Sequence, residues 1–382
     1  MPVVKISLRQ VSILTALYTI GSAILIVPSS MASIAKQDAW IACLVGTGLG
    51  FIILALQLQL FKKYPETNLM QLSEKLFGKW IGKTINLLFL LTLFLGGPAT
   101  VLHEIGIFIT IQMLPETPIQ AIIFLFGALV VLGVRLGLEV LARSAEMLFP
   151  WFLLLFLSMS LLLLSEIKWE NAMPIFESGM NPFLPAAVSF VSITFLPNIV
   201  LMIIYPGAVN RPAEAYKAVY IGSLFGAMVL FTIIGLTILV LGPDITARNL
   251  YPSYMLSKKI NIGNFLQRIE AVMAVMWFIT LFYRISLYFY AIAIGVSQIF
   301  NIKNYQPLVV PLGWILAAVS VFIYPNVPFK SVWDSKTWIP YTITIGIILP
   351  LVLFGMHGLR KIGSKKTKGP QKPSERLEDK VG

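Results

Sequence analysis

The chain has 382 residues, of which 57% are hydrophobic and only 12% are charged, against about 25% charged residues in soluble domains. Its mean hydropathy of +0.84 excludes a soluble globular protein and predicts an all-α integral membrane protein. The net charge of +12 does not indicate nucleic-acid binding, because much of the excess lies in the tail after Gly358, where basic residues near a membrane report topology.

The first apolar run, residues 10–34, is long enough to cross a bilayer but contains residues that a straight helix avoids. Gly21 tolerates non-helical dihedral angles, Ser22 competes for backbone hydrogen bonds, and Pro28 lacks a donor. Unwound backbone at membrane depth survives only where it lines a cavity or is buried in protein. The stretch therefore predicts either a ligand site built on free N–H and C=O groups or a simple proline kink in a packed helix.

Ten transmembrane helices are predicted in all. They are residues 10–34, 39–61, 82–112, 118–135, 147–165, 182–205, 216–241, 265–299, 307–324 and 338–357. With the N-terminus inside, the inner segments carry 20 of the 29 Lys and Arg residues and the outer loops carry eight. This asymmetry predicts that both termini are cytoplasmic.

Three connections and the tail have a character of their own. Residues 62–81 mix leucines with lysines, which predicts a short helix on the inner surface. Arg135, Glu139 and Arg143 are spaced to pair along one helix face. The polar loop 242–264 is predicted to cap the outer vestibule. We predict a polytopic domain over residues 1–360 and a disordered, basic cytoplasmic tail over residues 361–382.

A second interrupted span lies at residues 182–205, where Pro197 and Asn198 fall at mid-membrane. If the chain consists of two inverted halves of five spans, about 10–165 and 182–357, this span is the sixth and the equivalent of the first. Paired interruptions at matching places in two halves point to a binding site between inverted repeats. The symmetry rests on span order and breaks, since the halves show no residue-level repeat.

Glu104 lies inside the third span, just after the helix-loosening Gly96-Gly97-Pro98. A carboxylate near the bilayer centre costs several kcal/mol unless it faces the interior and finds a partner or a proton. Three roles stay open: a protonation site, a ligand for a substrate amine, or a structural hydrogen-bond partner. His103 lies about 100° away around the helix and is either a satisfied interior histidine or a functional one.

Arg284 lies midway along the eighth span and needs a partner at that depth. It is predicted either to neutralise Glu104 or to pair helices through their carbonyl groups. Glu270 lies fourteen residues earlier, on roughly the same helix face but closer to the outer surface.

The sequence contains no phosphate loop, no ATP-binding domain, no zinc-ligand spacing and no nucleophile–base pair, and Cys43 is the only cysteine. We therefore expect no enzymatic activity, no cofactor, no metal site and no internal disulfide.

Motifs along the whole chain carry a family resemblance. The stretch Ile20-Gly21-Ser22-Ala23-Ile24 is similar to the break in the first span of amino acid–polyamine–organocation transporters. More specific are Gln37-Asp38-Ala39-Trp40, Leu114-Pro115-Glu116-Thr117-Pro118, Arg135-Leu136-Gly137-Leu138-Glu139-Val140-Leu141-Ala142-Arg143, Arg268-Ile269-Glu270-Ala271 with Trp277, Ile285-Ser286-Leu287-Tyr288-Phe289-Tyr290, Tyr305-Gln306-Pro307-Leu308-Val309 and Pro311-Leu312-Gly313. Over about residues 5–360 the chain resembles the spore germination permease family, the B subunits of germinant receptors.

This resemblance implies a LeuT-like fold of ten spans in a 5+5 inverted repeat, with the first and sixth helices broken. It implies a multi-pass protein of the spore inner membrane that recognises a nutrient such as an amino acid. It also implies two partners, a membrane-embedded A subunit and a lipoprotein C subunit. The ligand-binding residues that the resemblance implies are Gly21, Ser22, Ala23 and Ile24 in the first span and Thr194, Phe195, Leu196 and Asn198 in the sixth. To these the membrane-buried charges discussed above add Glu104 as a ligand-binding residue, and His103, Glu270 and Arg284 as coupling or structural charges.

Two departures from the transporter pattern bear on function. Ala23 stands where many transporters have a second glycine, and Arg284 lies near the region where transporters hold a cation. Both suit a receptor that binds without transport. The leading hypothesis is therefore a germinant-sensing subunit that binds a small nutrient between the first, third, sixth and eighth spans. The alternatives are a proton-coupled transporter of amino acids or organic cations, which would use Glu104, and a scaffold with a vestigial pocket.

Overall fold

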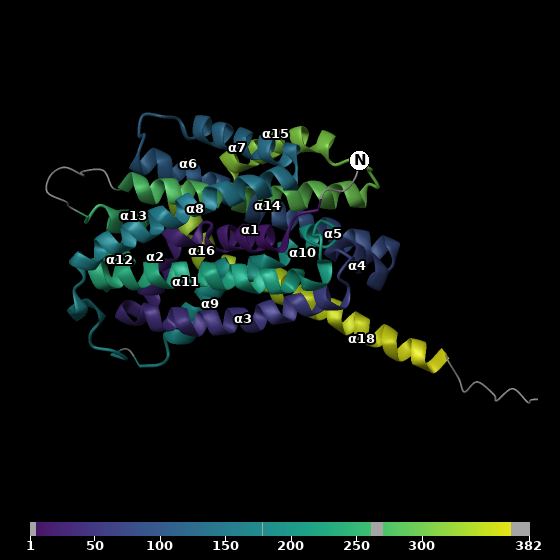
Figure 1. Ribbon diagram of the computed structural model, residues 1–382, viewed down its shortest axis with the longest axis horizontal. Coiled ribbons are helices and arrows are strands. Elements are labelled where there is room, and N and C mark those ends of the chain that lie inside the picture. Colours follow the sequence, from purple (N-terminus) through teal and green to yellow (C-terminus); the bar gives the residue numbers. More distant parts are fainter. Residues whose placement is uncertain (1–4, 178, 261–269, 368–382) are drawn as a thin grey trace, which may run out of the picture.

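The computed structural model describes residues 5–177, 179–260 and 270–367, and within these ranges the regular elements are helices, joined by turns and irregular connections (Figure 1). An isolated bridge between Ile6 and Val209 is the one β-type pairing of the described residues. The predicted all-α class is confirmed. Part of the predicted tail, residues 368–382, and residues 265–269 of the predicted eighth span lie outside the described residues.

The helices occupy the predicted spans in order. The first half contains α1 (Leu8–Ile20), α2 (Ala23–Ala35), α3 (Ala39–Lys63), α4 (Leu69–Phe77), α5 (Lys79–Phe94), α6 (Thr100–Gln112), α7 (Ile119–Leu136) and α8 (Leu138–Leu163). The second half contains α9 (Phe183–Thr194), α10 (Leu201–Ile204), α11 (Ala215–Leu241), α12 (Pro243–Arg248), α13 (Pro252–Ser257), α14 (Glu270–Ile299), α15 (Gln306–Phe322), α16 (Val327–Lys336), α17 (Trp338–Ile343) and α18 (Leu349–Thr367).

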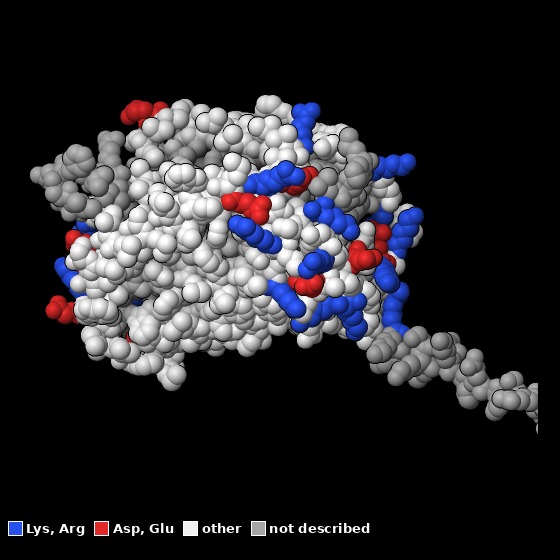
Figure 2. All heavy atoms as spheres, in the orientation of Figure 1, with Lys and Arg blue, Asp and Glu red and all other residues white. Residues whose placement is uncertain are grey.

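Among the described residues, eight helices are long and apolar enough to cross a membrane, or nine if α15 and α16, bent by 101° from each other, form one span. Figure 2 shows a broad area left of the middle of the visible face almost free of Lys, Arg, Asp and Glu, with most of the visible basic residues in the half that carries α4 and α18. Such a belt is what a lipid-facing surface requires. The count of ten crossings and the inverted repeat stay predictions.

The first span is broken where predicted. Ser7 and Gln10 cap α1 reciprocally at its start, and the helix ends at Gly21, whose φ of +31° is a conformation that residues with a Cβ rarely adopt. A Cβ at this position would also lie 2.2 Å from Cδ of Arg284. Helix α2 starts again at Ala23 and runs through Pro28 without a break, so glycine and not proline sets the interruption.

The sixth span is broken as well. Helix α9 ends at Thr194, a 3₁₀ turn follows over Leu196–Val200, and α10 covers only Leu201–Ile204. Pro197 has no N–H to donate to the carbonyl of Ile193, four residues earlier, so the α-helical ladder stops there.

The third span is continuous but widened into a π-helical turn, Leu95–Ala99, between α5 and α6. This turn contains Pro98, which cannot donate to the preceding turn. The hydroxyl of Thr100 donates instead to the carbonyl of Leu95 at 2.9 Å. Such turns recur at functional sites, and this one lies a single helical turn before Glu104.

Pairs of glycines bring the broken spans close to their neighbours. Helix α1 packs on α11 at Gly222 and Gly226, and α9 packs on α3 at Gly46 and Gly50. A Cβ on Gly222 would lie 2.4 Å from the carbonyl oxygen of Ser12. Small residues at this four-residue spacing let helix backbones approach closely in membranes.

Two of the connections and the start of the predicted tail can be compared with the structure expected for them. Helix α4 turns Leu69, Leu72 and Leu76 inward, as an interfacial helix would. Glu139 and Arg143 pair at 2.5 Å on the exposed start of α8. Helix α18 continues to Thr367, so residues 361–367, predicted to be part of a disordered tail, are helical.

The packing of α1 on α11 generates a stability prediction. Replacing Gly222 with Ala places a methyl group against backbone that cannot move aside, and overpacking of this kind costs about 1–3 kcal/mol. We expect the melting temperature of the purified protein in detergent to fall.

Gly235→Ala is the matched control on the same helix, because a Cβ there meets nothing within 4 Å. We expect this variant to melt at or above the wild-type temperature. Equal behaviour of the two variants would contradict the proposed role of the glycine pair.

Candidate functional site

A cavity of about 100 Å³ lies between the two broken spans. Its walls come from the broken helices, from α6 and α14, and from α16 and α17 near the C-terminus. The lining residues are Ser22, Ile26, Ser30, Thr100, Val101, Glu104, Ser189, Ile193, Arg284, Asp334, Trp338 and Ile339. A water molecule takes roughly 30 Å³ in the liquid, so this central cavity has room for a ligand of only a few heavy atoms.

Arg284 connects the C-terminal ends of the two half-helices. Its Nη1 donates to the carbonyl of Tyr18 at 3.2 Å, and its Nη2 donates to the carbonyl of Ile193 at 2.7 Å. The Ile193 carbonyl is the group that Pro197 leaves without a donor. Helix C-termini carry partial negative charge, so a buried guanidinium neutralises both ends at once.

Aromatic and hydroxyl side chains complete the surroundings of Arg284. The guanidinium lies 5.3 Å from the ring centroid of Tyr18 and 5.8 Å from that of Tyr288, within the range of cation–π attraction. The hydroxyl of Thr280 donates to the carbonyl of Gly21 at 3.1 Å. The opened backbone of the first span is therefore bonded from α14 at two points.

The predicted first-span residues lie at the start of α2. Ser22 lines the central cavity, and Gly21 lies against Arg284. Ala23 and Ile24 are fully buried and do not line it. The first N–H groups of a helix have no partner four residues earlier in the helix; at the start of α2 the N–H of Leu25 donates to the carbonyl of Ser22 at 3.4 Å.

The predicted sixth-span residues point elsewhere. Thr194 donates to the carbonyl of Phe190 in its own helix, and Phe195 packs its ring against Phe51 and Phe190. The carbonyl of Leu196 accepts from Gln57. Asn198 donates to the hydroxyl of Ser223 at 3.3 Å. The sixth span reaches the central cavity through other residues of α9, Ser189 and Ile193.

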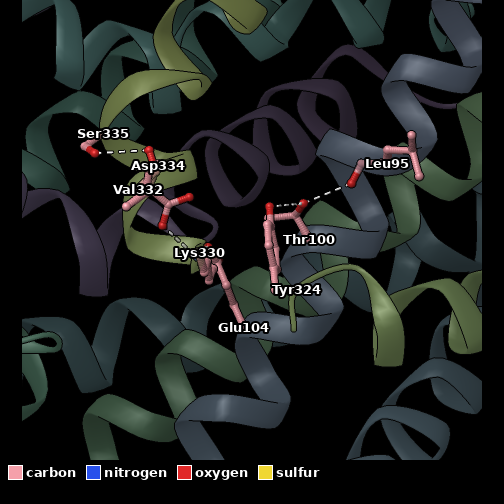
Figure 3. Close-up of polar contacts among 8 residues, drawn as sticks. All are labelled: Leu95, Thr100, Glu104, Tyr324, Lys330, Val332, Asp334 and Ser335. Atoms are coloured by element: carbon pink, nitrogen blue, oxygen red, sulfur yellow. Dashed lines mark hydrogen bonds and ion pairs between the residues drawn. The ribbon is translucent and has the colours of Figure 1, made fainter. Parts of the chain in front are cut away.

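Glu104 is paired, but not with Arg284. Its Oε1 lies 3.0 Å from the Nζ of Lys330, which also contacts Oδ2 of Asp334 at 2.5 Å (Figure 3). The hypothesis that Arg284 neutralises Glu104 is thus wrong, because Arg284 is bonded to carbonyl groups. Glu104 itself lines the central cavity with one face of α6.

The two remaining charged candidates lie outside the central cavity. Nδ1 of His103 lies 2.7 Å from the carbonyl oxygen of Ser320, and its ring packs on Tyr324. It is a satisfied interior histidine. Glu270 is the first residue of α14 and is not among the residues that line the cavity.

An outer cavity of about 380 Å³ adjoins the central one. The two share Ile26, Ser30, Glu104, Ser189, Asp334 and Ile339. Leu250 and Tyr251, from the connection between α12 and α13, also line the outer cavity. This loop was predicted to cap the vestibule, and these two residues lie where such a cap would.

Several site residues were missed in the sequence. In the sequence, Lys330 and Asp334 look like ordinary charges of an outer loop. However, Asn326-Val327-Pro328 is typical of a helix start, and charges four residues apart in a helix can pair. Together these two features could have indicated the pair. Ser30 and Ser189 had no such signal, because a serine in an apolar helix is most often bonded to its own backbone.

Comparison with known proteins agrees with this architecture. The chain is 28% identical to spore germination protein KB of Bacillus subtilis (strain 168) over 96% of its own length and 98% of that relative. It is 27% identical to spore germination protein YndE of the same organism, over 83% and 88%.

Solved structures show the fold. The chain matches Mhp1, a nucleobase-cation-symport-1 family transporter, with a TM-score of 0.65 at 16% identity, over 91% of this chain and 78% of that one. It matches MhsT, solved in complex with L-phenylalanine, with a TM-score of 0.60 at 13% identity, over 91% and 97%. The predicted LeuT-like transporter fold is confirmed. Because residues 5–328 match the family model described as spore germination protein, the chain belongs to the spore germination protein family.

Proposed function

We propose that this protein is the germinant-sensing subunit of a spore germination receptor, and that a small amino acid binds in the central cavity. One observation carries the proposal: a cavity sized for a few heavy atoms lies between two half-helices, with a buried cation and a buried carboxylate in its walls. A zwitterion is the ligand that matches walls carrying both signs of charge, Arg284 on one side and Glu104 and Asp334 on the other. The protein is not an enzyme, since its family is a germination receptor and permease-type family.

The carboxylate of the ligand would meet the start of α2. The N-terminus of a helix combines free N–H groups with a favourable dipole for anions. Beside it, the Nε–H of Arg284 has no acceptor among the described residues. The ligand ammonium would then lie on the side of Glu104.

Signalling follows if the ligand has different affinities for two arrangements of the bundle, because a ligand shifts an equilibrium only by that difference. The partners that would read this shift are the receptor's A subunit and its lipoprotein C subunit. We place the protein in the spore inner membrane with the basic end of the bundle, which carries α4 and α18 (Figures 1 and 2), on the core side.

The runner-up is a proton-coupled transporter that would use Glu104. Against it, Arg284 is bonded to the carbonyl groups of both half-helices. This bond between the two breaks favours a binding protein over one that cycles.

The proposed function predicts that the protein binds its ligand without taking it up. Purified full-length protein, screened by thermal shift against the amino acids and then reconstituted in liposomes, should bind one of them saturably with no concentrative uptake under a proton gradient. Gradient-driven accumulation would favour the transporter instead.

A pair of matched tryptophan variants tests where the ligand binds. Ile26→Trp should abolish binding, because Ile26 lines both cavities. Ile52→Trp should bind as wild type, because Ile52 is 68% exposed on the outer surface of α3. Unchanged binding in Ile26→Trp would place the ligand elsewhere.

The proposed function also predicts that ligand binding does not depend on sodium. Transporters of this fold coordinate Na⁺ with unwound carbonyls and half-helix C-terminal ends, and Arg284 already holds such carbonyls in this protein. Replacing Na⁺ with choline at constant ionic strength should leave the ligand Kd within about twofold, a change under 0.5 kcal/mol. A tenfold weaker affinity in choline would show that a sodium site exists despite Arg284.

A further inference from the structure

Lys330 is a buried ammonium group between two carboxylates. It is 8% exposed, and lysine is almost never buried unless it is paired. Its partners come from two elements: Glu104 from α6 and Asp334 from the same helix, α16 (Figure 3). The cluster therefore ties α16 to α6 through one ion pair, Lys330 with Glu104.

Glu104 is only half satisfied by this contact. Lys330 reaches its Oε1, while Oε2 is buried and has no hydrogen-bond donor among the described residues. Glu104 is 9% exposed and lines both the central and the outer cavity. The buried Oε2 is thus an unfilled acceptor of a residue that borders both cavities, and a small side-chain rotation would bring it to a cationic donor there.

Lys330 can leave Glu104 without losing a partner for its own charge, and the ammonium group of a ligand would replace it at Glu104. Its second partner, Asp334, is four residues further along α16 and would move with it. The Asp334 side chain is 41% exposed, so the pair would move toward the outer cavity rather than deeper into the bundle. Helix α16 has ten residues and is bent by 101° from α15, which makes it a separate unit.

We propose that Glu104 is the acceptor for the primary ammonium group of the ligand, and that Lys330 is a tethered substitute which this group displaces. Displacement releases α16 from α6, so occupancy of the central cavity is coupled to the outer wall of the protein. The proposal rests on the function proposed above and specifies the ligand class as a primary ammonium compound. An ammonium group with three N–H donors fits this role, whereas a quaternary ammonium has none.

Chemical rescue tests the acceptor. Lys330→Ala removes the atoms that n-propylammonium contains, so the purified full-length variant should melt at a lower temperature than wild type and regain stability saturably with n-propylammonium. Tetramethylammonium at equal ionic strength should not restore it, and the double variant Glu104→Gln/Lys330→Ala should not respond. Lys336→Ala, an exposed lysine on the same helix, is the control and should need no rescue.

Ligand affinity tests the displacement. Removing an internal competitor raises the population that can bind, so Lys330→Ala should bind the amino acid more tightly, by roughly tenfold if the released arrangement is about one-tenth populated in wild type. Lys330→Met keeps the apolar stem and should also bind more tightly, without rescue by n-propylammonium. It serves as the test if Lys330→Ala does not fold.

Two outcomes would overturn the proposal: n-propylammonium rescuing the single and double variants equally, or the Lys330 variants binding the amino acid less tightly than wild type. Both would reduce Lys330 to a structural role. Rescue by n-propylammonium in a protein that binds no amino acid would leave the ammonium site standing and refute the sensing function, so the two failures are distinguishable.

Discussion

The guanidinium of Arg284 is the contact on which the broken architecture depends. Two helices end inside the membrane, and each leaves carbonyl groups that hydrocarbon cannot satisfy. Arg284 donates to one carbonyl from each, Tyr18 and Ile193, and its charge opposes the partial negative charge of both helix ends. The contact with Tyr18 lies just before the break after which α2 begins, where Ser22 lines the central cavity.

Close packing of the half-helices is the second requirement, and glycines meet it twice in the same way. Gly46 and Gly50 on α3 receive α9, while Gly222 and Gly226 on α11 receive α1. In two inverted halves, the second and seventh spans would be equivalent, as would the first and sixth. The matching glycine spacing is what such a repeat would produce, although the sequences of the halves show no wider likeness.

Two buried cations, Arg284 and Lys330, have different kinds of partner and different roles. Arg284 is fixed by backbone carbonyls, which do not dissociate from the fold. Lys330, in contrast, is held by carboxylates of which one belongs to another helix. In the displacement proposed above, a primary ammonium group competes for the carboxylate of Glu104, whereas the carbonyl groups that hold Arg284 belong to the two helix ends themselves. The arginine therefore supports the two breaks, and the lysine is the contact that we propose to be exchangeable.

The sequence by itself determined the class of protein, the order of the helices and both interruptions, because these follow from local chemistry: apolar length, the freedom of Gly21 and the missing N–H of Pro197. It also indicated that Glu104 and Arg284 need partners. Which partners they have was decided only by the tertiary structure, since Lys330 lies 226 positions after Glu104 and the bend before α16 brings it inward. Thr194 and Asn198 were predicted to face a ligand from the resemblance of the sixth-span break to that of transporters, but their side chains bond the carbonyl of Phe190 and the hydroxyl of Ser223. Side-chain direction at a break depends on packing, which no local pattern records.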